Sequence, residues 1–275
     1  MIKNHIKTGI FLALLTGIFL GIGSIWGQSG LIIAFIIAII MNFGSYWFSD
    51  KIVLSMYGAK QISKNRAPKL HEAVEEVAEK ANIPKPTVYL IPTKSPNAFA
   101  TGRNPDHAAV ACTAGIMNLL SEEELKGVLA HEISHIKNRD TLIQAVVATI
   151  AGAISYIAFF ARFAAIFGGD EEAGGMFELL ALAILAPITA TMIQLAISRN
   201  REYLADKSGA ELIEDGKPLA RALQKLEKAP KLKGRGGSKS TSSLFIVNPF
   251  SKKGLMTLFS THPPVEERVN RLEKI

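Results

Sequence analysis

The motif HEISH, at residues 131–135, combines two histidines and a glutamate at a spacing suited to metal chemistry. Ser121 and Glu124 form a capping-box pattern ahead of it, which predicts a helix through the motif. Residues four apart stack on one face of a helix, so His131 and His135 can bind one ion. Glu132 is rotated by roughly 100° and can reach a water molecule on that ion without displacing a ligand.

Imidazole and carboxylate ligands favour zinc, which lowers the pKa of a bound water molecule to about 7. Glu132 would take the proton of that water and deliver it to a leaving amine. This predicts hydrolysis of peptide bonds with one Zn²⁺ per chain. An ordinary amphipathic helix is the alternative, but apolar residues before the motif would then bury imidazoles that have no evident partner.

A catalytic zinc needs a third protein ligand and an open position. Glu202 is the best candidate, because two apolar blocks between it and His135 would form a hairpin that returns the chain to the motif. Asp206 lies one turn further on the same face and could accept the second N–H of a zinc-bound histidine. Spacing alone leaves open that both carboxylates pair at the surface with neighbouring cations, namely Arg199, Arg201 and Lys207.

Four long apolar blocks predict membrane-spanning helices in two hairpins. They cover residues 6–26, 31–48, 142–167 and 176–197. A cleaved signal peptide is the alternative for the first block. Arg162 and Pro187 interrupt the third and fourth blocks, so buried core helices are the alternative there.

The charge distribution predicts the orientation of these spans. Hydrophobic residues make up 48% of the 275 residues, the net charge is +7, and the mean hydropathy is +0.23. Lys and Arg gather on one side of every block, whereas the turn 27–30 is uncharged and the loop 168–175 is acidic. The positive-inside rule therefore places the polar parts and both termini in the cytoplasm.

The basic residues are explained by a lipid bilayer rather than by nucleic acid, since no nucleic-acid-binding motif is present. Cys112 is the only cysteine, which excludes an intramolecular disulfide.

The polar segments predict a small catalytic domain of the α+β type. Strands are expected at 87–91 and 108–113, with a short one at 97–101. The predicted fold is a mainly α membrane protein with a zincin-like α+β domain, about four transmembrane helices and a small β-sheet. The predicted domains are a transmembrane hairpin at 1–50, catalytic parts at 51–141 and 199–275, and a second hairpin at 142–198.

Four sequence pieces resemble the HtpX-type membrane metalloproteases, which are related to the CAAX prenyl proteases. The pieces are HEISHIKNRD (131–140), SRNREYLAD (198–206), PNAFATG (96–102) and THPPVEERVNRL (261–272). The resemblance implies zinc ligands at His131, His135 and Glu202, a general base at Glu132, and Asp206 as partner of a ligand. It also implies a stress-related role in quality control at the cytoplasmic (inner) membrane, with unfolded, damaged or misassembled membrane proteins as substrates.

The resemblance extends to two further parts of the chain. His262 lies in the piece whose histidine is thought to stabilise the oxyanion, although a histidine that caps a loop would look the same. Residues Asn97, Ala98, Phe99 and Ala100 lie in the piece that resembles a substrate-binding edge, which could pair with an extended peptide. The alternative for this piece is a turn between strands.

Two other functions fit the same sequence. A CAAX-type prenyl protease is one, although four spans can hardly enclose a large intramembrane chamber. A membrane scaffold with a structural metal is the other, and it would need a fourth protein ligand that the motifs do not supply.

Overall fold

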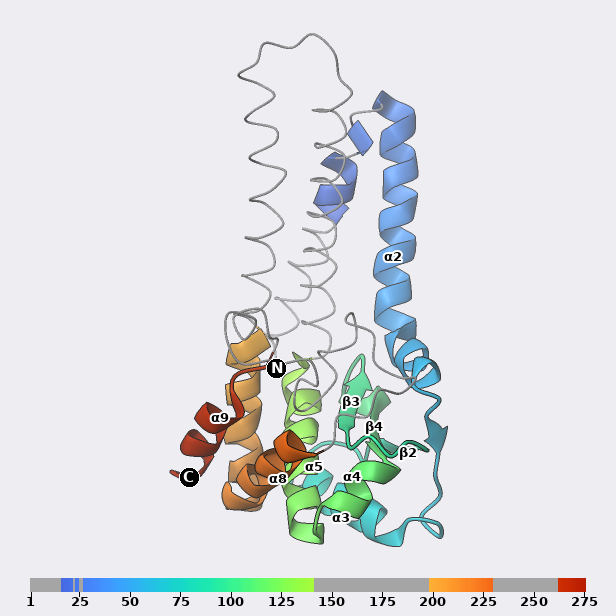
Figure 1. Ribbon diagram of the computed structural model, residues 1–275. Helices are drawn as coiled ribbons and strands as arrows, with labels where there is room; N and C mark the ends of the chain where they lie inside the picture. The colour runs from blue at the N-terminus through green and yellow to red at the C-terminus, as the bar shows by residue number, and fades with distance from the viewer. Residues whose placement is uncertain (1–15, 22, 25–26, 141–197, 230–261) are drawn as a thin grey trace. The chain divides into compact units, whose positions relative to one another are not determined.

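A computed structural model describes residues 16–21, 23–24, 27–140, 198–229 and 262–275 (Figure 1). The chain divides into two compact units. One consists of Met1–Tyr46 and Leu142–Ile197, and the other of Trp47–Thr141 and Ser198–Ile275. All candidate site residues belong to the second unit.

Helix α2 (Gly27–Met56) begins in the first unit and contains the second apolar block. Within the described ranges, no helix has both the length and the apolarity that a bilayer crossing requires. The third and fourth apolar blocks and most of the first lie outside the described residues. The number of spans therefore stays a prediction.

The second unit contains a four-stranded sheet in the order β1-β2-β4-β3. The strands are β1 (Lys60–Gln61), β2 (Thr87–Ile91), β3 (Ala98–Gly102) and β4 (Ala108–Thr113). Strand β2 is parallel to β4, and β3 is antiparallel to β4 with Ala100 opposite Val110. The predicted small sheet is confirmed, and β3 lies at its edge.

Helices cover the sheet and form most of this unit (Figure 1). They are α3 (Pro68–Ala81), α4 (Ala114–Leu119), α5 (Glu122–Asn138), the helical residues 198–213, α8 (Lys217–Lys228) and α9 (Val265–Leu272). A short 3₁₀ turn, η1 (Pro105–His107), joins β3 to β4. The mainly helical fold with a small sheet agrees with the prediction.

Successive side chains of a strand point to opposite faces of a sheet, and at β3 and β4 both faces are buried. Val110 and Cys112 pack in the core formed with α3 and α5. Phe99 and Ala111 pack on the other face with Leu54 of α2. This explains why all of β4 is buried and why its residues from Ala108 to Cys112 are apolar. Burial also raises the pKa of the Cys112 thiol to about 12, which disfavours the nucleophilic thiolate form.

The start of helix α5 is fixed by the predicted capping box. The Glu124 amide donates to Ser121 Oγ, and the Ser121 amide donates to a Glu124 carboxylate oxygen at 2.9 Å. Lys225 of α8 also donates to the Glu124 carboxylate at 2.7 Å. The cap thus ties α5 to α8 and sets where the metal-binding motif begins.

Replacement of Glu124 by Gln is expected to destabilise the fold in a pH-dependent way. Burial opposes ionisation of Glu124, but Lys225 and the Ser121 amide lower its pKa below 4.5. A carboxyl group whose pKa is lowered by folding adds stability above its unfolded pKa, and this stability is lost as the pH falls through the folded pKa. We expect Glu124→Gln to lower the free energy of unfolding by about 1 kcal/mol at pH 7 and by less below about pH 4.

Chemical denaturation of the purified chain at the two pH values measures this difference. Glu123→Gln is the control, since the Glu123 side chain is 79% exposed. An equal effect of Glu124→Gln at both pH values would contradict the assignment.

Candidate metal centre

The site forms where helix α5 crosses the helical residues 198–213. Gly209 makes this crossing close, because a Cβ atom there would lie 2.9 Å from the His131 backbone nitrogen. No other residue lacks a Cβ atom, so only glycine allows the two backbones to approach this closely. The crossing brings Glu202, seven residues earlier on that helix, to the imidazoles of α5.

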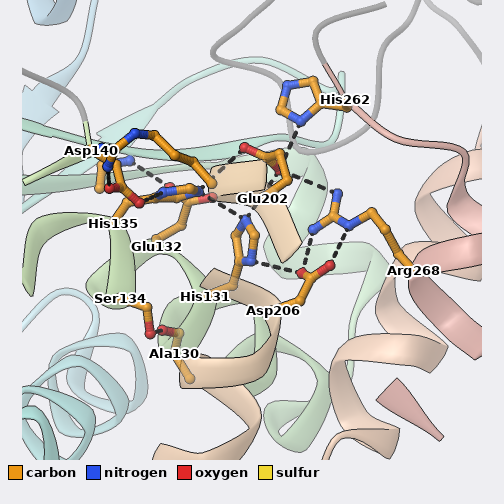
Figure 2. Close-up of polar contacts among 12 residues, drawn as sticks. Ala130, His131, Glu132, Ser134, His135, Asp140, Glu202, Asp206, His262 and Arg268 are labelled. Atoms are coloured by element: carbon orange, nitrogen blue, oxygen red, sulfur yellow. Dashed lines mark hydrogen bonds and ion pairs between the residues drawn. The ribbon is translucent and has the colours of Figure 1, made fainter. Parts of the chain in front are cut away.

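His131, His135 and Glu202 converge on one point, as Figure 2 shows. Their candidate ligand atoms all lie within 4.8 Å of one another, and all three residues are buried. The two Nε2 atoms are 3.2 Å apart, and the Glu202 carboxylate oxygens lie 3.6 Å from His131 Nε2 and 3.4 Å from His135 Nε2. Two imidazoles and one carboxylate at this separation form a donor set that zinc prefers.

The outer nitrogen of His131 faces a buried carboxylate. His131 Nδ1 lies 2.9 Å from Asp206 Oδ1, the partner that the sequence predicted for a ligand histidine. Asp206 in turn accepts hydrogen bonds from Arg268 Nε at 2.8 Å and Nη2 at 2.7 Å. A proton on Nδ1, toward Asp206, would leave the lone pair of His131 on Nε2, which faces Glu202.

His135 has its own carboxylate partner at the other side of the site. His135 Nδ1 lies 2.9 Å from Asp140 Oδ2, and Arg201 donates to the other oxygen of Asp140. Asp140 is fully buried. The lone pair of His135 Nε2 therefore also faces Glu202.

The charges of this cluster favour a divalent cation. Among the described residues, it contains four buried carboxylates and two guanidinium groups, so two negative charges remain when all the carboxylates are ionised. The members are Glu132, Asp140, Glu202, Asp206, Arg201 and Arg268. When both imidazoles carry their proton on Nδ1, the two Nε2 lone pairs lie 3.2 Å apart and repel each other unless a cation lies between them. The residues thus fit zinc in number, type and charge.

Glu132 lies beside the three converging residues on α5. One of its carboxylate oxygens accepts a hydrogen bond from the Ala100 amide of β3 at 2.8 Å. Burial raises the pKa of Glu132, whereas the nearby His131 and His135 act in the opposite direction. The carboxylate is therefore oriented by the edge strand and kept away from bulk water.

Burial would raise the pKa of Glu202, but three histidines hold it well below its usual value. One of them is His262, whose Nδ1 lies 2.8 Å from a Glu202 oxygen. His262 is buried, and its Nε2 makes no hydrogen bond within the described part of the chain. A residue 60 positions after Glu202 is thus brought directly to the site.

The segment from Asn97 to Ala100 also borders the site. The Thr113 amide donates to the Asn97 carbonyl, and pairing alternates along an antiparallel ladder. The backbone groups of Ala98 and Ala100 therefore point away from β4. The Ala100 amide then meets Glu132 on that outer edge.

Sequence reasoning missed three members of the cluster. Arg268 carried a signal, since it lies on the apolar stripe of α9 with Val265, Val269 and Leu272. A charged residue on such a stripe needs a buried partner. Asp140 and Arg201 carried no such signal. The sequence assigned Arg201 to topology or to a surface pair, but the structure shows that it binds Asp140.

Loss of Arg268 is expected to destabilise the chain strongly. The side chain is fully buried, and Arg268→Met would leave the Asp206 carboxylate without its counter-charge. Removal of one partner of a buried pair costs about 3–5 kcal/mol. Denaturant unfolding of the purified chain measures the loss. Arg271→Met on the same helix is the control, because Arg271 is 55% exposed and should contribute about 1 kcal/mol or less. Equal losses of unfolding free energy in the two variants would show that the buried pair of Arg268 and Asp206 contributes no more than an exposed arginine.

Comparisons with known proteins show the family of the chain. The sequence model of Peptidase family M48 matches residues 64–275. A "Protease HtpX homolog" of Pyrococcus furiosus is 54% identical over 277 residues, which cover 98% of this chain and 95% of the relative. A protein of the same name from Persephonella marina is also 54% identical, with 98% and 96% covered.

The crystal structure of S. mikatae Ste24p shares the fold, with a TM-score of 0.60 at 19% identity. The match covers 99% of this chain and 66% of that one. These findings confirm the predicted metalloprotease and the resemblance from which part of the prediction came. The chain belongs to peptidase family M48.

Proposed function

We propose that the chain is a membrane-bound zinc endopeptidase in which Glu132 acts as general base. The observation that carries this proposal is the convergence of His131, His135 and Glu202, with Glu132 beside them. The three converging residues would hold one zinc ion per chain. Zinc, when bound there, supplies a Lewis acid and makes a water molecule acidic enough to act as a nucleophile near neutral pH.

The residues of the chain orient and move protons around that centre. Glu132 is poised to take a proton, since burial raises its pKa toward neutrality, where a general base works best. The Ala100 amide holds one of its oxygens in place. The same carboxyl group would then pass the proton to the leaving amine.

His262 is proposed to stabilise the negative charge that develops on the substrate carbonyl oxygen. Its Nδ1 contacts Glu202, while Nε2 is buried and has no hydrogen-bond partner among the described residues. An N–H donor that is already oriented at the site needs little reorganisation when charge appears.

Strand β3 is proposed to align the substrate through its outer edge at Asn97, Ala98, Phe99 and Ala100. The backbone groups of Ala98 and the Ala100 carbonyl point away from β4 and can pair with an extended peptide, while the Ala100 amide holds Glu132. An unfolded segment can adopt this conformation, whereas a folded domain has its strands already paired. This favours unfolded or damaged proteins as substrates.

A membrane location is proposed for this activity, with the catalytic parts in the cytoplasm. Helix α2 exposes a series of large apolar side chains, which water-soluble surfaces avoid. They include Ile32, Ile33, Phe35, Ile36, Ile39 and Ile40. From the resemblance to the HtpX-type proteases, we further propose quality control of membrane proteins as the wider role.

Glu132→Gln is expected to abolish cleavage of an unfolded protein such as casein while zinc stays bound. Gln keeps the shape of the side chain but cannot take a proton, so a loss of about 10²-fold or more is expected. Purified chain in detergent is assayed for cleavage and for zinc content, with and without a chelator. Glu123→Gln, an exposed change on the same helix, is the control. Cleavage by Glu132→Gln at the normal rate would refute the proposed base.

Glu202→Gln is expected to weaken zinc binding, because an amide is a poorer ligand than a carboxylate. The matched control is Glu211→Gln, since Glu211 is 58% exposed on the same helix. Zinc content after dialysis against a weak chelator distinguishes the two variants. An unchanged zinc content in Glu202→Gln would place the third ligand elsewhere.

A further inference from the structure

We propose that Asp140 and Arg201 form a positioning pair that orients His135 and thereby sets how tightly the site holds zinc. The inference rests on the proposed metal site. It assigns roles to two residues outside the set of candidate ligands: Asp140, which contacts His135, and Arg201, which contacts Asp140.

The contacts form a continuous chain from Arg201 to the ligand. Arg201 donates to one oxygen of Asp140, and the other oxygen lies 2.9 Å from His135 Nδ1. Asp140 is fully buried, and the Arg201 side chain is 14% exposed. Figure 2 shows Asp140 beside His135, on the side away from Asp206.

Asp140 determines which of the two ring nitrogens of His135 carries the proton. An imidazole has two nitrogens, and only the one without a proton can bind a metal. A carboxylate at Nδ1 holds the proton there and leaves the Nε2 lone pair toward Glu202. It also fixes the angle of the ring, which otherwise rotates about its bond to Cβ.

Arg201 is needed because the Asp140 carboxylate is buried. A buried charge without a partner is costly, and the guanidinium group offsets this cost while it fixes the orientation of the carboxylate. Arg201 also directly precedes Glu202 in the sequence. One helical turn therefore supplies one ligand itself and orients a second ligand through Asp140.

This pair works separately from the pair that orients His131. Asp206 contacts His131 and is paired with Arg268, whereas Asp140 contacts His135 and is paired with Arg201. The second His ligand sits in the last turn of α5, where the Arg139 backbone turns to a φ of 56° and the helix ends. Helix ends fray more readily than helix centres, so His135 has more need of a fixed partner than His131.

Zinc affinity of the full-length chain in detergent tests this proposal. All variants are made in the Glu132→Gln background, so that neither self-cleavage nor a loss of activity affects the measured zinc affinity. Competition with a chromophoric chelator gives the affinity, and far-UV circular dichroism monitors the fold. We expect Asp140→Asn and Arg201→Gln each to weaken zinc binding by about 10- to 100-fold. The matched controls are Glu211→Gln and Lys207→Met, an exposed pair on the same helix, and they should retain the parent affinity.

The double variant tests whether Arg201 acts through Asp140. If it does, Arg201→Gln adds little to the loss caused by Asp140→Asn, whereas independent roles would multiply the two losses. Parent affinity in Asp140→Asn, or multiplied losses in the double variant, would overturn the proposal. If Asp140→Asn does not fold, Arg201→Gln decides alone, and parent affinity there overturns it. Failure of the proposed protease function would appear instead as the absence of zinc-dependent cleavage by the unsubstituted chain, which these measurements do not involve.

Discussion

The buried charge at the metal centre is the constraint on which the rest of this unit depends. Four carboxylates in a low-dielectric site repel one another strongly unless cations lie among them. Two guanidinium groups meet part of this need, and a divalent ion would meet the remainder. The fold must therefore bring Arg201 and Arg268 to the carboxylates at the same time as it brings the imidazoles together. A chain that failed in either task would bury unpaired charge.

Three separate stretches meet that requirement together. Helix α5 provides His131, Glu132 and His135, the helical residues 198–213 provide Glu202 and Asp206, and α9 provides Arg268. The close crossing at Gly209 sets the distance between the first two stretches. The Ala100 amide of strand β3 donates one hydrogen bond to Glu132, and this bond links the edge of the sheet to the catalytic helix. Stability and function thus rest on the same contacts.

The parts of the site that could be predicted from the sequence are those set by local geometry. The helical period places His131 and His135 on one face, and the capping box at Ser121 fixes where the helix begins. Glu202 followed from chain reversal between the apolar blocks, and the structure brings it to the histidines. The pairings of Asp140 and Arg268 could not be read in this way, because they depend on how separate helices pack. Arg201 shows the difficulty well, since charges beside an apolar block look alike whether they face lipid or a buried carboxylate.

The position of α9 in the sequence determines when the metal centre can assemble during synthesis of the chain. Synthesis on the ribosome proceeds from the N-terminus, so both histidines of α5 emerge long before Glu202, His262 and Arg268. A nascent chain that has made α5 but not α9 would carry imidazoles and carboxylates without the arginine that balances them. Such a chain has an incomplete centre, and we expect no hydrolysis by it until Glu202 and α9 have been made and have packed together with α5.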